Sequence, residues 1–335
     1  MISALIITNM YPYEKFPFYG MVVKEEVDCL RREGVDTEVL FINGRETRWN
    51  YLLGMFKLAR LLAWRRFDII HTHHSYCACM AIMARACLRL KAPLILTLHE
   101  GEICHKGKVS YRMDLIEKLK YARFFKNYVI GRVDRLIAVY EGLLKTPLKA
   151  PYSIIPCGIN TGLFRPLPKG DCRKKLGINE NARVIFFPSD YRRPEKRFDL
   201  VKKAHTILRA YYGDNLILLK GGAIDYDLMP VYLNASDVTV LASDYEASPM
   251  VIKEALATNT PIVSVDVGDV KQVIAGVKGC YITAQEPRDI AQQLKYALDF
   301  NRRTTGRERI EELSLSACQA SFTIKEVYGR LASRN

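Results

Sequence analysis

The sequence predicts an α/β protein built from two Rossmann-like, doubly wound parallel-sheet domains. The chain has 335 residues, which is more than one hydrophobic core usually serves. Short apolar runs alternate with helical patterns, as is typical of parallel sheets covered by helices on both faces. The alternation occurs twice, once in each half of the chain. We therefore predict an N-terminal domain at 1–160 and a C-terminal domain at 161–320.

The first half contains five predicted strands and one clear amphipathic helix. The helix covers 21–33, where Val22, Val23, Val27 and Leu30 form an apolar face, and it ends at Gly34. The apolar runs that we interpret as strands are 2–8, 37–42, 68–71, 93–98 and 135–139.

The second half repeats this arrangement. We expect strands at 184–188, 216–219, 238–241, 262–265 and 280–283, and helices at 196–211, 229–235, 249–257 and 287–300. The two halves join within 152–174, a segment rich in proline and glycine. Open parallel sheets bind ligands beyond the carboxyl ends of their strands, so functional residues are sought there.

Composition favours a soluble globular protein, with 49% hydrophobic and 26% charged residues. No long uncharged apolar run exists, and no basic segment precedes the first strand, so we expect neither a membrane span nor a signal peptide. The nine cysteines include no CxxC pair. We interpret them as reduced thiols in a cytoplasmic protein.

The net charge of +14 favours an anionic partner, and most of the excess lies in residues 1–150, with 24 Lys and Arg against 15 Asp and Glu. Aromatic residues and cations mix within 50–67 and 106–126. This mixture suits a helix on an anionic membrane surface, and equally a helix packed on the N-terminal sheet with a solvated basic edge. No RNA-binding motif is present, so we expect no nucleic-acid partner.

Two carboxylates flank the start of the helix predicted at 249–257. Ser248 suits the N-cap and Pro249 the first helical position, which leaves the amides of 250–252 as an anion site. Glu246 precedes the cap, and Glu254 lies inside the helix, where it can accept hydrogen bonds from sugar hydroxyls. An ordinary strand, loop and capped helix also explains this pattern.

A basic cluster, residues 192–197, follows the strand predicted at 184–188. Its four cations, Arg192, Arg193, Lys196 and Arg197, oppose the helix dipole, and a bound diphosphate would remove that conflict. The alternative is a solvated turn in which Asp190 and Glu195 pair with these cations.

Three further groups of polar residues are candidates for functional sites. His99 ends the strand predicted at 93–98 and either faces a cleft or caps a loop. His71 and His73 share one strand face, but the sequence offers no clear third ligand beyond the suggestive Cys77 and Cys79, so we expect no metal. We assign the pair of Asp225 and Asp227 to a surface loop. Neither half contains a GxGxxG fingerprint, which argues against a nicotinamide or flavin enzyme.

The segment from Glu246 to Glu254 resembles the E-x7-E signature of retaining GT-B glycosyltransferases of family 4, also described as glycosyl transferases group 1. The similarity continues through 255–263 and 267–270. It includes the interdomain segment at 155–166 and the first loop at 8–12 with Tyr19 and Gly20. It therefore covers nearly the whole chain in the right order.

The resemblance implies roles for individual residues. Glu254 would bind the donor ribose, and Glu246 and His99 would contact the transferred sugar. Lys196 matches the lysine of the family, whereas Asp190 or Tyr191 stands where its arginine often falls, so Arg192 or Arg193 would meet the diphosphate. Gly20 would bring the backbone close to the donor phosphates. Backbone amides would contact sugar and phosphate at Ser248, Pro249, Met250 and Val251.

The implied activity is that of a metal-independent, cofactor-free retaining hexosyltransferase. It would move a sugar from a UDP- or GDP-linked donor to a glycan or lipid-linked acceptor in polysaccharide biosynthesis, in the cytoplasm or at the inner face of the membrane. A final helix at 321–335 would cross back to the first domain. A nucleotide-sugar epimerase of the same build, or a binding subunit with a degenerate site, are the alternatives.

Overall fold

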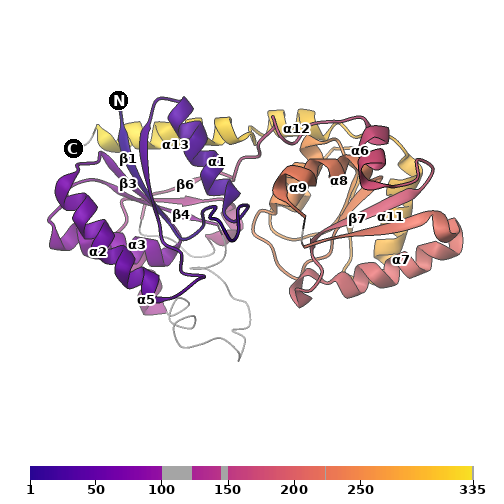
Figure 1. Ribbon diagram of the computed structural model, residues 1–335, viewed down its shortest axis with the longest axis horizontal. Coiled ribbons are helices and arrows are strands. Elements are labelled where there is room, and N and C mark those ends of the chain that lie inside the picture. The colour runs from indigo at the N-terminus through magenta and orange to yellow at the C-terminus, as the bar shows by residue number, and fades with distance from the viewer. Residues whose placement is uncertain (100–122, 145–149, 223, 334–335) are drawn as a thin grey trace. The chain divides into compact units, whose positions relative to one another are not determined.

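The computed structural model describes residues 1–99, 123–144, 150–222 and 224–333 (Figure 1). The chain divides into two compact units, and each is described by itself. Unit 1 comprises Met1–Gly158 and Ala317–Asn335, and unit 2 comprises Ile159–Ser316. The boundaries that we predicted lie at 160 and 320, two and four residues further along the chain.

Unit 1 is built on a six-stranded parallel sheet in the order β2-β1-β3-β4-β5-β6. Five of these strands were predicted. The sixth, β6, lies in the segment that we assigned to the interdomain join; it is only three residues long, and none of them is buried. The strands are β1 (Ser3–Thr8), β2 (Asp36–Phe41), β3 (Ile69–His73), β4 (Leu94–Leu98), β5 (Arg135–Ala138) and β6 (Tyr152–Ile154).

Helices cover both faces of this sheet (Figure 1). The predicted helix is α1 (Met21–Arg32), and it packs beside α13 (Ala317–Ala332), the last helix of the chain. Ile324, Val327 and Tyr328 of α13 join the same apolar core as Val23 and Val27 of α1. The other described helical segments are α2 (Trp49–Trp64), α3 (Ser75–Cys87), α5 (Arg123–Ile130) and the 3-10 turn η1 (Glu141–Leu143).

Unit 2 contains a five-stranded parallel sheet in the order β11-β10-β9-β7-β8. All five strands were predicted. Phe186 and Phe187 are adjacent in β7 and belong to separate apolar cores, so both faces of the sheet are covered, as expected. The strands are β7 (Arg183–Asp190), β8 (Leu216–Gly221), β9 (Val238–Leu241), β10 (Ile262–Val265) and β11 (Cys280–Thr283).

The helices of unit 2 lie in two layers. One layer contains α7 (Phe198–Tyr212) and α11 (Pro287–Phe300). The other contains α8 (Met229–Ala235), α9 (Met250–Ala257) and α12 (Gly306–Glu312). The remaining elements are α6 (Lys169–Leu176), α10 (Val270–Val273) and the 3-10 turns η2 (Pro194–Lys196), η3 (Gly213–Asn215) and η4 (Tyr226–Leu228).

Two smaller expectations concern polar and apolar surface. Asp225, which precedes η4, and Asp227, which lies within it, are both exposed, in agreement with their assignment to the surface. In the part of the chain that the structure describes, no helix combines the length and the apolar character that a bilayer crossing requires.

Candidate active site

A lysine and a glutamate form a largely buried ion pair in unit 2. Lys196 Nζ lies 2.5 Å from Glu246 Oε1, and the side chains of both residues are only 16% exposed. Ser243 Oγ donates a second hydrogen bond to the same carboxylate oxygen, at 2.8 Å. The two donors fix the orientation of the Glu246 carboxylate. A pair that is so little exposed is screened less by salt than an ion pair at the surface.

The sheet topology explains why these residues meet. Lys196 ends η2, which follows β7, and Glu246 lies in the loop after β9, and these two strands are neighbours in the parallel sheet. Their carboxyl ends therefore share one edge, where ligands bind in such folds. The Asp244 amide donates to the Glu195 carbonyl at 2.9 Å and so ties the loop to the turn.

Arg197, which we counted among the cations of the basic cluster without assigning it a role of its own, also belongs to this site. It adopts a left-handed conformation with φ of 54° between η2 and α7, so the helix that we predicted from residue 196 begins at Phe198 instead. Its Nη1 donates to Asp244 Oδ1 at 3.0 Å, and Gln285 Nε2 donates to the same oxygen at 2.8 Å. Arg197 therefore stabilises the loop that carries Glu246.

The other two cations of the basic cluster are paired within the turn. Arg192 makes two hydrogen bonds to Asp190, at 2.8 and 2.9 Å, and Arg193 Nε donates to Glu195 at 2.7 Å. The bonds from Arg192 lower the pKa of the Asp190 carboxyl. These are the pairings of the solvated-turn alternative, and they relieve the conflict with the helix dipole without a bound anion. Only Lys196 of the cluster contacts Glu246.

The start of α9 differs from the prediction by one residue. The helix begins at Met250, so Pro249 is the N-cap and not the first helical residue, and its extended ψ of 118° sets the turn into the helix. Ser248 is not the cap, because its hydroxyl instead donates to Asp269 Oδ2 at 2.5 Å. Burial raises the pKa of the Asp269 carboxyl. Helix α9 therefore starts without a side-chain cap.

The residues that we assigned to the donor ribose and phosphates are placed as follows. Glu254 lies in the second turn of α9 and is 7% exposed. Met250 and Val251 form the first turn, and the Ile252 amide, which we also assigned to an anion, donates to the Pro249 carbonyl at 3.2 Å. The loop after β9 and helix α9 therefore carry both E-x7-E carboxylates and Ser248, and η2 brings Lys196 to Glu246.

The backbone of unit 1 explains why residue 20 is a glycine. It has φ of 70° at the N-cap of α1, where a Cβ atom would lie 2.3 Å from the Met10 carbonyl carbon. A glycine is therefore required by the neighbouring backbone. Its approach to donor phosphates stays a prediction.

His99 follows β4 and is held by two neighbours. Its Nε2 lies 2.8 Å from His73 Nδ1, and its Nδ1 lies 3.3 Å from Cys157 Sγ. Burial and, to a smaller extent, the nearby His73 together lower the pKa of His99 to about 3. The imidazole is therefore neutral near pH 7, so it can exchange hydrogen bonds with a substrate but supplies no positive charge. Glu102, an acidic residue three positions after His99, lies outside the described residues.

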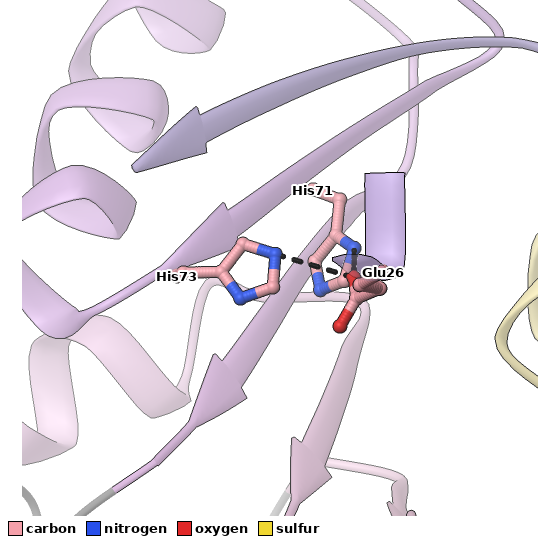
Figure 2. A group of neighbouring side chains, drawn as sticks. All are labelled: Glu26, His71 and His73. Atoms are coloured by element: carbon pink, nitrogen blue, oxygen red, sulfur yellow. Dashed lines mark ion pairs between the residues drawn. The ribbon is translucent and has the colours of Figure 1, made fainter. Parts of the chain in front are cut away.

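His73 also belongs to a second group, with His71 and Glu26 (Figure 2). Glu26 Oε1 lies 3.4 Å from His73 Nε2 and 3.7 Å from His71 Nδ1. Glu26 was not among the residues that we predicted, because it lies on α1, far from the histidines along the chain. Its only signal was a charged residue beside the apolar positions Val23 and Val27 of that helix. Within the described ranges, Cys77 and Cys79 do not join this group.

Comparisons with known proteins agree with these features. A family model described as "Glycosyltransferase Family 4" matches residues 16–163, and one described as "Glycosyl transferases group 1" matches residues 192–299. A solved structure of sucrose-phosphate synthase from Thermosynechococcus elongatus superposes with a TM-score of 0.79, at 16% identity, over 100% of both chains. The expected GT-B fold is thereby confirmed.

Two curated relatives match this chain over only part of their own length. A D-inositol 3-phosphate glycosyltransferase of Thermobispora bispora is 25% identical, over 75% of this chain and 67% of its own length. A UDP-Gal:alpha-D-GlcNAc-diphosphoundecaprenol alpha-1,3-galactosyltransferase of Escherichia coli is 27% identical, over 62% of this chain and 60% of its own. The chain thus spans about two thirds of the length of the curated relatives that it matches.

Proposed function

Because the chain belongs to the group 1 glycosyltransferases of family 4, we propose that it transfers a hexose from a UDP- or GDP-linked donor to a glycan or lipid-linked acceptor. The observation that supports this proposal most directly is the buried pair of Lys196 and Glu246, held by Ser243 at the carboxyl edge of the unit 2 sheet. The donor named for the Escherichia coli relative is UDP-Gal, and its acceptor is an alpha-D-GlcNAc carried on diphosphoundecaprenol.

The pair suits the charges that develop when a nucleotide sugar reacts. The bond between the sugar C1 and the β-phosphate oxygen breaks, which places negative charge on the diphosphate and positive charge on the sugar ring. The Lys196 ammonium stabilises the departing diphosphate, and the Glu246 carboxylate lies against the sugar. Lys196 is the cation best suited to this role, because its side chain is far less exposed than those of Arg192 and Arg193.

The proposed reaction retains the anomeric configuration. The acceptor oxygen forms its bond to C1 on the face that the diphosphate leaves, and its proton passes to a phosphate oxygen. This route needs no covalent nucleophile, and the cation with the amides at the start of α9 takes the role that a metal ion has in other enzymes. We therefore propose that the enzyme needs neither a metal nor a cofactor.

The assignment of Lys196 and Glu246 is tested by turnover and binding together. Calorimetric titration with UDP and GDP identifies the base, and nucleotide sugars of that base are then assayed with and without acceptor. We expect Lys196→Ala and Glu246→Ala to remove turnover while the fold persists. Lys202→Ala, which removes an exposed cation of α7, serves as the matched control and should remain active. A Lys196→Ala enzyme of wild-type activity would refute the assignment.

The finer features have separate readouts. The anomeric proton coupling of the product, observed by NMR during turnover, reports retention or inversion. Activity should survive dialysis against a chelator, and loss of activity that Mg²⁺ or Mn²⁺ restores would contradict metal independence. Donor consumption in the absence of any acceptor, without a glycosidic product, would instead indicate an epimerase.

We further propose that unit 1 rests on an anionic membrane surface through α2. This helix buries Gly54, Leu58 and Leu62, yet it also carries exposed cations at Lys57 and Arg60. A helix that served only as cover for the sheet would not expose large apolar side chains. Exposed side chains of this kind lie along its length, at Trp49 (72%), Leu52 (50%), Leu53 (55%), Phe56 (67%) and Trp64 (89%). Apolar groups beside cations suit the headgroup region of an acidic bilayer.

Vesicle sedimentation tests the membrane proposal. Binding should require anionic phospholipid, weaken with salt, and fall at least tenfold in Phe56→Ser and Trp64→Ser. Tyr211→Ser removes an aromatic side chain of similar exposure (68%) from unit 2 and should change nothing. Equal binding to neutral and anionic vesicles would contradict the electrostatic part, and unchanged binding of the α2 variants would contradict the docking surface.

A further inference from the structure

A row of four polar side chains crosses the interior of unit 1. Glu26 of α1 contacts His73 at the end of β3 over 3.4 Å, and His73 contacts His99 over 2.8 Å. His99 in turn contacts Cys157, which follows β6, over 3.3 Å. Figure 2 shows the first step, in which the Glu26 carboxylate points at the ring of His73. The row thus runs from α1, through the histidine that we assign to the donor sugar, to Cys157.

The contact between Glu26 and His73 determines which ring nitrogen of His73 carries its proton. Glu26 Oε1 and His73 Nε2 are buried, lie 3.4 Å apart, and have no partner of ordinary hydrogen-bond geometry among the residues described. A carboxylate oxygen accepts hydrogen bonds, so a proton on His73 Nε2 is the arrangement in which these two buried atoms become partners. The 3.4 Å separation is a little longer than an ordinary N–H···O bond, as is common in sites without substrate.

The positions of the protons on His99 and Cys157 follow from the proton on His73 Nε2. With its proton on Nε2, His73 presents a lone pair at Nδ1, so His99 donates from its own Nε2. His99 Nδ1 is then an acceptor, and the Cys157 thiol donates to it. A neutral histidine normally exchanges between two tautomers, and this row selects one of them.

His71 does not belong to the row, although it lies beside Glu26. Its Nδ1 lies 2.6 Å from the Tyr328 hydroxyl and its Nε2 lies 2.7 Å from Thr97 Oγ1, so both ring nitrogens already have partners. A metal held by Glu26, His71 and His73 would have to displace the Tyr328 hydroxyl. The hydrogen bonds of His71 therefore favour a proton row over a metal site in this group.

We propose that Glu26 and His73 are positioning residues that hold His99 as the neutral tautomer with Nδ1 open as an acceptor. A thiol is a weak donor, so a sugar hydroxyl can replace Cys157 at that nitrogen. A cavity of about 20 Å³, lined by Glu26, Thr97, His99 and Cys157 among others, adjoins the row and has room for about one water molecule. The proposal rests on the proposed function only where it assigns a sugar hydroxyl to His99.

NMR of the histidine rings tests the tautomer without any substrate. The chain has six histidines, so long-range ¹H–¹⁵N correlations of ¹⁵N-histidine-labelled protein give few signals, and His99→Gln identifies those of His99. We expect a protonated Nε2 and an unprotonated Nδ1. In Glu26→Leu, His73 loses the acceptor for its Nε2 proton and should carry its proton on Nδ1 instead. His73 Nδ1 then donates to His99 Nε2, so the proton of His99 should move to its Nδ1. Glu26→Gln should keep the wild-type tautomer, because its amide oxygen still accepts.

Turnover and metal analysis complete the test. Glu26→Leu should lower turnover by about tenfold, Glu26→Gln much less, and Asp28→Asn, an exposed carboxylate of the same helix, not at all. A wild-type His99 protonated on Nδ1, or one equivalent of a divalent metal in protein purified without chelator, would overturn the row. If no nucleotide sugar is turned over while the tautomers agree, the proposed function fails and the row stands.

Discussion

Mild acid should destabilise unit 1 through its buried histidines. The unfolded chain returns His99 to the ordinary histidine pKa of about 6.5, whereas burial lowers the pKa of His99 to about 3 in the folded protein. The unfolded state therefore binds more protons as the pH falls below 6.5, and stability declines from there toward pH 3. The loss between pH 8 and pH 5 is about 2 kcal/mol from His99 alone. His71, whose pKa burial also lowers, acts in the same direction.

The measurement must report on unit 1 separately, because a chain of two compact units need not unfold in one step. Hydrogen exchange of amides in β3 and β4, corrected for the intrinsic rate at each pH, gives the free energy of opening of this sheet. The matched variant is His99→Gln, which removes one titrating group. Its opening free energy should depend on pH less steeply than that of the wild type, by the same ~2 kcal/mol between pH 8 and pH 5.

The reasoning fails if the opening free energy of β3 and β4 is unchanged between pH 8 and pH 5. It also fails if His99→Gln and the wild type share one pH dependence, since His99 would then titrate alike in both states. Exchange of β9 and β10 in unit 2 provides the internal control, because His99 lies in the other unit.

Three further outcomes follow from local geometry. Gly20→Ala should lower the free energy of unfolding by about 2 to 4 kcal/mol, because it adds a clash with Met10 to the strain of a positive φ. Gly34→Ala should lower it by about 1 kcal/mol, because residue 34 has a φ of 82° but open space around it. Urea unfolding measures both. Asp237→Ala should destabilise unit 2 by about 3 to 5 kcal/mol, because it removes the carboxylate that pairs with the buried Arg173 and with the partly exposed Lys169. A hydrogen-exchange profile like that of the wild type would contradict this. Hydrogen peroxide should join Cys29 and Cys318, whose sulfur atoms lie 2.9 Å apart, into a disulfide with release of water, and peptide mass spectrometry should find that cross-link.

Local sequence determined the elements of the two sheets. The strands β9, β10 and β11 and the helices α8 and α11 have the bounds that we predicted. Buried parallel strands are continuous apolar runs, and helices repeat their apolar positions over three to four residues, so both signals lie within a few neighbouring residues. The E-x7-E carboxylates lie as expected on a loop and the helix after it.

Tertiary structure decided which side chains meet. Serine is a residue type that often caps helices, yet the Ser248 hydroxyl donates its hydrogen bond to Asp269 from another loop. The pairing of Lys196 with Glu246 depends on β7 and β9 being neighbours in the sheet. Glu26 was missed because only the packing of α1 on the sheet brings it to His73. Hydrogen bonds and ion pairs act over a few ångströms in space, so their partners are set by how the elements pack and not by their spacing along the chain.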